Sequence, residues 1–125
     1  MSLIRVDNFG PSAGGTTYSA RGIAKVWWQF DQYYTNTIVG SLNVSSGVDG
    51  GTGVFLANFT NSMSDASYSV ANSLGGNNSY GAIYSYDVGT DFLSSSLRGL
   101  IRQTASPTVS QDAQRVMAEI HGDLA

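Results

Sequence analysis

The stretch KVWWQFDQYYTNTIVGSLNVSSGVDGGTGVFLANFTNSMSDASYSV, residues 25–70, carries the most regular alternation of apolar and polar side chains in the chain. Val26, Trp28 and Phe30 occupy every second position, and a second alternating series runs over residues 38–44. A period of two is typical of β-strands that bury one face. The stretch therefore predicts a β-meander.

The same alternation, with turn residues between its segments, predicts roughly seven strands. They are expected at residues 23–30, 37–44, 54–60, 68–74, 81–88, 92–104 and 114–121. Residues 45–53, SSGVDGGTG, are predicted to form a long turn, because glycine tolerates positive φ values. The final segment also contains good helix formers, so a helix there stays an alternative. The pattern predicts an all-β protein, an antiparallel β-sandwich.

Residues 1–22 precede the first predicted strand, and Pro11, Gly14 and Gly15 interrupt regular structure there. We expect an extended N-terminal arm or linker over residues 1–22 and one sandwich domain over residues 23–125. Two accounts of the arm stay open, a disordered terminus and a segment that packs on a neighbouring subunit. The first residues lack the basic and apolar regions of a secretory signal, so we expect no signal peptide and synthesis in the cytoplasm.

Composition narrows the classes of function. Only 12% of the 125 residues are charged, the formal net charge is −3, and cysteine is absent. A nucleic-acid-binding protein needs a basic surface to displace counterions from phosphates, so we expect no nucleic-acid partner. No run of residues is apolar and long enough to span a bilayer, so we expect no membrane insertion. Stability is expected to come from packing and assembly, without disulfides.

Candidate catalytic residues are few. His121 is the one histidine and Glu119 the one glutamate, and the two would share a strand face. Asp87 and Asp91 could place carboxylates around Ca²⁺, but their segment lacks the ligand density of an EF-hand loop. The glycine-rich turn has no Lys-Ser/Thr partner for phosphate. We therefore expect a protein that is not an enzyme and that has no metal site and no cofactor.

Aromatic and amide side chains are the remaining candidates for ligand contact. An aromatic ring can pack on the apolar face of a sugar while hydroxyls and amides bond to its rim. Trp27 is expected on the strand face opposite to Trp28, which is assigned to the core. The predicted ligand-binding residues are Trp27, Tyr33, Tyr34, Asn77, Asn78, Tyr80 and Tyr84.

Several apolar side chains fall on strand faces that the alternation directs away from the core. A small sandwich should not expose so much hydrophobic surface, and closed rotational symmetry would bury it. We therefore predict subunit contacts in a homotrimer. The predicted interface residues are Val39, Val54, Leu56, Leu100 and Met117.

The segments AKVWWQFD and NVSSGVDGGTGVFLANFTNSMSDASYSV resemble the motif of a distal module of bacteriophage tail fibres, KAWVxF(D/N)G followed by NVSSxxDxGTGxYxVxFxxxMxxxxYxV. The closing VMAEIHGD is similar to the final strand of that family. Departures include Trp28 where the family often has valine, QYYTN in place of a short glycine turn, and Val54 and Leu56 at usually polar positions. The matching positions are Ala24, Lys25, Trp27, Phe30, Asp31, Asn43, Val44, Ser45, Ser46, Asp49, Gly51, Thr52, Gly53, Phe59, Met63, Tyr68 and Val70.

This resemblance implies a virion component, the homotrimeric tip of a tail fibre that helps a phage attach to its bacterial host. The leading hypothesis is non-enzymatic binding of a bacterial surface polysaccharide or another host receptor. One alternative is a purely structural module that trimerises or caps the fibre. Another is a polysaccharide depolymerase in which aspartates and Glu119 act as acid and base.

Overall fold

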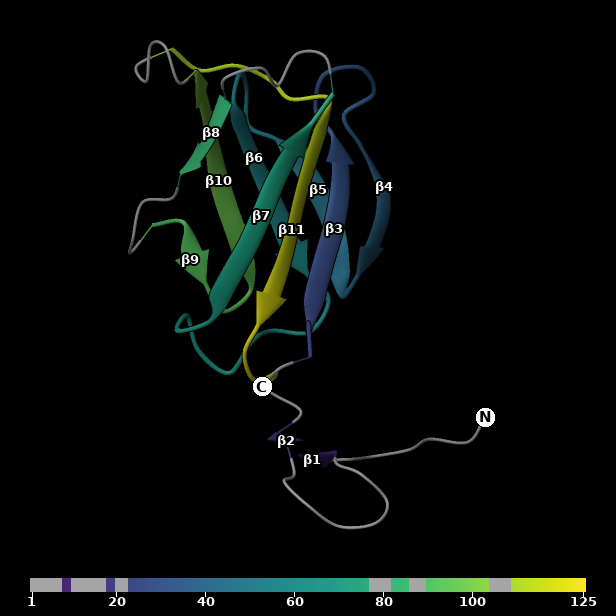
Figure 1. Cartoon of the computed structure of the whole chain (residues 1–125), viewed down its shortest axis with the longest axis vertical. Helices are drawn as coiled ribbons and strands as arrows, with labels where there is room; N and C mark the ends of the chain where they lie inside the picture. Colours follow the sequence, from purple (N-terminus) through teal and green to yellow (C-terminus); the bar gives the residue numbers. More distant parts are fainter. Residues whose placement is uncertain (1–7, 10–17, 20–22, 77–81, 86–89, 104–108) are drawn as a thin grey trace.

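The fold is all-β. The computed structural model describes residues 8–9, 18–19, 23–76, 82–85, 90–103 and 109–125, and these residues contain strands and turns but no helix. Two antiparallel sheets face one another in a β-sandwich, with β7, β11 and β3 in front of β10, β6 and β5 in Figure 1. None of the described segments is a long apolar helix of the kind that crosses a membrane.

Each layer of the sandwich has four main strands. The first sheet has the order β4-β3-β11-β7, and its members are β3 (Val26–Asp31), β4 (Thr37–Leu42), β7 (Ser69–Gly75) and β11 (Arg115–His121). The second has the order β5-β6-β10-β8, with β5 (Val44–Asp49), β6 (Val54–Phe59), β8 (Ala82–Ser85), β10 (Ser96–Gln103) and the short β9 (Phe92–Leu93) beside β10. Strands β1 (Asn8–Phe9) and β2 (Tyr18–Ser19) form a separate antiparallel pair.

The core lies between the two sheets, and the alternation within β3, β6 and β11 puts it there. The side chains of Trp28 and Phe55 face one another from opposite sheets, with ring centroids 5.9 Å apart. The predicted inward positions of β3 and β6 are confirmed. The buried apolar residues are Val26, Trp28, Phe30, Phe55, Ala57, Phe59, Met63, Tyr68, Leu97, Ile101, Ala113, Val116, Ala118 and Ile120.

Strand β4 departs from the predicted alternation because of a β-bulge. Phe30 pairs with Ile38 but Gln29 pairs with Gly40, so Val39 is an extra residue that has no partner on β3. A single extra residue reverses the direction of every following side chain. Leu42 therefore lies opposite Trp27 and points to the outer face with it. The alternation over residues 38–44 predicts that Leu42 shares a face with Ile38, and this prediction is wrong.

The predicted long turn over residues 45–53 is mostly a strand. Strand β5 pairs with β6 through Asp49, which lies opposite Phe55, and only Gly50–Gly53 remain as the turn. Serine and glycine in β5 favoured a loop in the sequence, but the hydrogen bonds to β6 override that weak local preference. The glycine prediction holds within the turn, where Gly51 and Gly53 have φ values of 102° and 70°.

Two other segments change in detail. The predicted strand over residues 92–104 is a hairpin, in which β9 and β10 are joined by Ser94 and Ser95. The predicted strand at residues 114–121 is confirmed as β11, and the helical alternative is wrong. Strand β11 lies at the centre of its sheet, where it pairs with β3 and β7 on both sides, so tertiary pairing outweighs helix propensity.

Candidate functional site

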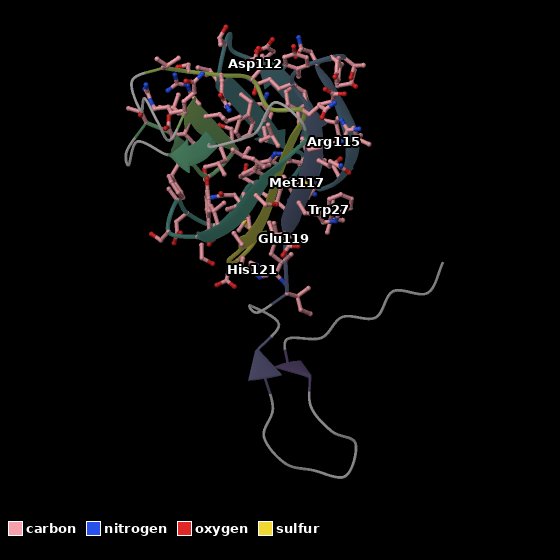
Figure 2. The ribbon with its side chains drawn as sticks, turned by 45° about the horizontal axis from the view of Figure 1, so that its top comes forward. Trp27, Asp112, Arg115, Met117, Glu119 and His121 are labelled. Atoms are coloured by element: carbon pink, nitrogen blue, oxygen red, sulfur yellow. The ribbon has the colours of Figure 1, made fainter. Side chains whose placement is uncertain are left out.

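The outer face of the first sheet carries the most exposed tryptophan. Residues directly opposite one another on paired strands point to the same face. One row across this sheet is Leu42, Trp27, Glu119 and Ala71. The next is Gly40, Gln29, Met117 and Ser73. Figure 2 shows Arg115, Met117, Glu119 and His121 along β11, with Trp27 beside them from β3.

A shallow groove runs over β11 between β3 and β7, with a volume of about 410 Å³. We call it the aromatic groove. Its lining residues are Trp27, Trp28, Gln29, Ala71, Asn72, Ser73, Met117, Ala118 and Glu119. The small side chains of Ala71 and Ser73 keep the β7 side low, while the indole of Trp27 stands on the β3 side.

Trp27 is held in place by its neighbours although 39% of it is exposed. A Cβ atom at Gly40 would lie 3.3 Å from Cη2 of Trp27, so the indole lies over the bare backbone of Gly40. A side chain at that position would compete with the ring for space. The absence of one leaves room for the indole of Trp27 beside β4 at the border of the groove.

The groove is acidic. The side chain of Glu119 is 62% exposed. Its Oε2 lies 3.6 Å from Nε2 of His121, which follows two residues later on β11 and does not line the groove. Among the described residues that line the groove, Glu119 is the charged one. The other polar side chains on this face of the groove are the amide of Gln29 and the hydroxyl of Ser73.

The nearest arginine on this face is engaged elsewhere. NH1 of Arg115 lies 3.0 Å from Oδ2 of Asp31, whose side chain is 9% exposed. Burial raises the pKa of Asp31, but the Tyr34 backbone N–H, the hydrogen bond from Arg115 and its charge outweigh it, so the pKa lies below the usual value. Asp31 thus stays ionised and holds Arg115 beside the β3–β4 turn.

That turn carries two of the predicted ligand-binding residues. The Tyr34 N–H donates to Oδ1 of Asp31 at 2.9 Å, and the rings of Tyr33 and Tyr34 meet edge to face with centroids 4.8 Å apart. Both rings are exposed, Tyr34 by 62%. The turn that joins β3 to β4 lies at the upper end of the sandwich in Figure 1, whereas the C-terminus lies at the lower end.

The structure does not gather the predicted ligand-binding residues into one site. Trp27 lies on the sheet face. The turn that carries Tyr33 and Tyr34, which we call the tyrosine turn, begins after Asp31, and the part of β3 from Trp27 to Asp31 spans roughly 13 Å. Tyr84 belongs to β8 in the other sheet, opposite Ile101. Asn77, Asn78 and Tyr80 lie outside the described residues.

The predicted interface residues divide between the two sheets. Val54 lies opposite Leu100, and Leu56 lies opposite Val48 on the neighbouring strand, all on the outer face of the second sheet. We call Val48, Val54, Leu56 and Leu100 the aliphatic patch. Val48 is 43% exposed and the other three are half-buried. Met117 and Val39 belong instead to the first sheet, where Met117 lines the aromatic groove.

Few side chains in the described residues are placed to bind a metal ion or to act in catalysis. No cluster of three or more histidine, aspartate or glutamate side chains suited to a metal ion occurs in the described ranges. The side chain of Asp91, one of the two aspartates considered for Ca²⁺, is fully buried. Its Oδ1 lies 3.0 Å from NH1 of Arg98. Asp87 lies outside the described residues.

Sequence reasoning predicted Trp27 as a ligand contact, gave Met117 and Glu119 other roles, and did not predict that these residues line one groove. Gln29 could have been found, since it lies two residues from Trp27 and shares its face. Ala71, Asn72 and Ser73 could not, because their place depends on the pairing of β7 with β11, which is far away in the sequence. Comparison of the chain with protein-family models, with curated proteins and with solved structures finds no match.

Proposed function

We propose that this chain is a fibre-tip module that attaches a phage-like particle to a bacterial surface, as a homotrimer that binds surface glycan without cleaving it. The observation that carries the proposal is the role of the residues shared with the tail-fibre motif. Shared residues such as Phe30, Gly53 and Phe59 lie at positions on which the two sheets depend. Of the departures, Val54 and Leu56 lie on the outer face of the second sheet, whereas Trp28 lies in the core.

Asn43 illustrates the shared positions. It adopts a φ of 58° between β4 and β5, and its Oδ1 accepts a hydrogen bond from the Asn61 N–H at 2.7 Å. Asparagine is among the few residues that adopt this conformation readily. The chain can therefore pass from the first sheet to the second at this point.

Gly53 is a second example. Its N–H donates to Oδ1 of Asp112 at 2.7 Å, and its carbonyl accepts the Ile101 N–H at 2.7 Å. A Cβ atom there would lie 2.5 Å from the Ile101 carbonyl oxygen, so only glycine fits. The GTG part of the motif thus joins β6, β10 and the segment before β11. A protein that shares this fold therefore needs glycine at this position.

The aliphatic patch supports the trimer. Val54 and Leu56 are apolar where the motif is usually polar, and they lie beside Leu100 and Val48 on one sheet face. Three copies that turn this face toward a common axis would bury the patch and leave the first sheet facing outward. Three outward faces would then raise the avidity for a repetitive glycan.

Two measurements test the proposal. Analytical ultracentrifugation of the full chain is expected to give a trimer at micromolar concentration, and a stable monomer would contradict it. A glycan array probed with that trimer is expected to show binding. Intact trimers on a silent array would favour the structural module, and release of reducing ends from host polysaccharide would favour a depolymerase.

A further inference from the structure

We propose that the aromatic groove binds a pyranose ring of an uncharged glycan, stacked on Trp27 and hydrogen-bonded to Glu119. The inference rests on the proposed function of glycan attachment and adds to it the place of the site and the charge class of the ligand. It keeps the predicted ligand contact of Trp27 and leaves out the predicted contacts of Tyr33 and Tyr34.

The shape of the groove suits a flat ring. Its volume of about 410 Å³ is within the range of small-molecule sites, about 300–1,000 Å³. The indole of Trp27 is fixed over Gly40, so little side-chain freedom is lost when a ligand packs on it. Opposite the indole, Ala71 and Ser73 leave the β7 side open. A chain of sugars can then continue past the site.

The polar groups of the groove suit hydroxyls. A carboxylate accepts hydrogen bonds only, and two neighbouring sugar hydroxyls can donate to its two oxygens. Glu119 is directly opposite Trp27 in the register, so its carboxylate can reach the rim of a ring that stacks on the indole. Gln29 and Ser73 add an amide and a hydroxyl in the next row, which can donate to ring or hydroxyl oxygens.

The charges around the groove disfavour anionic sugars. Glu119 lines the groove, whereas Arg115 is held by Asp31 at 3.0 Å. Two other basic groups on this face, Lys25 and His121, do not line the groove, and His121 lies against Glu119. A sugar carboxylate or phosphate at Trp27 would therefore meet a like charge with no arginine to receive it.

Affinity electrophoresis of the full chain tests this site. The gels contain neutral polysaccharides, mannan, galactan and dextran, or anionic ones, alginate and polysialic acid. We expect retardation by a neutral polymer and none by the anionic polymers. Trp27→Ala should weaken that retardation at least about tenfold, because the stacking platform is lost. Glu119→Gln should weaken it by about fivefold and relieve the exclusion of anionic polymers.

The double variant Tyr33→Ala/Tyr34→Ala is the matched control, since it removes two exposed rings from the other aromatic surface. It should retain wild-type retardation. Trp27→Phe, which keeps a smaller ring, should give intermediate retardation, and the sedimentation of each variant shows that the trimer is intact.

The outcomes separate this inference from the proposed function. Retardation that survives Trp27→Ala, or is lost in the tyrosine variant, overturns the groove but leaves a glycan-binding module. Stronger retardation by alginate than by the neutral polymers overturns the charge class. Dissociation of the trimer by Trp27→Ala shows that a second copy covers the groove. Absence of retardation by every polymer overturns both proposals.

Discussion

The two outer faces of the sandwich are built from the same kind of strands but present different chemistry. The second sheet shows the four side chains of the aliphatic patch, which are flanked along β10 by Arg98 and Arg102. The first sheet shows an indole, amides and a carboxylate around a groove. An aliphatic surface suits a permanent contact between subunits, and an aromatic polar surface suits a reversible ligand. The difference supports our proposal that assembly and recognition use opposite sides of the sandwich.

Breaking the aliphatic patch should have the largest effect. Leu56→Glu places a charge in this patch and should dissociate the trimer, because Arg98, which lies opposite position 56, is already bound to Asp91 and a buried carboxylate is costly. Glycan retardation should then fall by about a hundredfold through lost avidity, although the groove is unchanged. Thr60→Glu, which adds the same charge just beyond β6, is the control and should keep both trimer and retardation. A Leu56→Glu trimer with normal retardation would refute the assignment.

Each sheet contains one buried aspartate that is paired with a half-exposed arginine, which allows the two sides to be compared directly. Arg98→Met leaves the carboxylate of Asp91 fully buried and should lower the free energy of unfolding by about 3 kcal/mol. Arg115→Met should cost about 1.5 kcal/mol, because the side chain of Asp31 is 9% exposed and that of Asp91 is fully buried. Urea unfolding at matched protein concentrations measures both. Equal losses would show that burial does not set the difference.

The ion pair of Asp31 and Arg115 also makes the stability of the first sheet depend on pH in the acid range. The pKa of Asp31 is lower in the folded state than its usual 3.8, so its contribution is full above that value and is lost as the pH falls through the folded pKa. Asp31→Asn should reduce the steepness of acid unfolding. Glu119→Gln, at an exposed carboxylate on the same sheet, should leave it unchanged, and an equal effect of both would contradict this account.

Tyr68 joins the two sheets and should show the smallest effect. Its hydroxyl donates to the carbonyls of Leu93 and Ser96 at 3.0 and 3.2 Å. Burial raises its pKa to about 12. Stability from the neutral phenol is therefore full below pH 10 and lost as the pH rises through about 12.

Tyr68→Phe tests that linkage. It should cost about 1 kcal/mol at pH 7, because two carbonyls lose a donor, and it should remove the alkaline loss of stability. Unfolding by urea at pH values from 7 to 12 measures both quantities. Tyr34→Ala, at an exposed phenol, is the control. Alkaline unfolding that is unchanged in Tyr68→Phe would exclude this residue as its source.

Local alternation predicted the parts of the fold in which one strand face is buried. Val26, Trp28 and Phe30 were found in this way, and so was the outward direction of Trp27. Alternation failed at Val39, because a bulge is decided by the pairing of two strands and leaves no clear mark in either. The residues 45–49 were missed for a related reason, since serine and glycine form a strand there only because β6 supplies hydrogen bonds.

The candidate site was less predictable than the fold. Its aromatic residue is visible in the sequence, but the groove exists only because β11 lies between β3 and β7 and because Ala71 and Ser73 are small. The aliphatic patch was predicted residue by residue, through Val54, Leu56 and Leu100. Their meeting on one face, together with Val48, required the register of three strands.

The proposal that the trimer forms through the second sheet and leaves the first sheet free is tested most directly by sedimentation of two matched variants, Leu56→Glu and Met117→Glu. Each places the same carboxylate on a half-buried apolar position at the middle of one sheet. The account predicts that Leu56→Glu sediments as a monomer and Met117→Glu as a trimer. A trimer for Leu56→Glu with a monomer for Met117→Glu would contradict it.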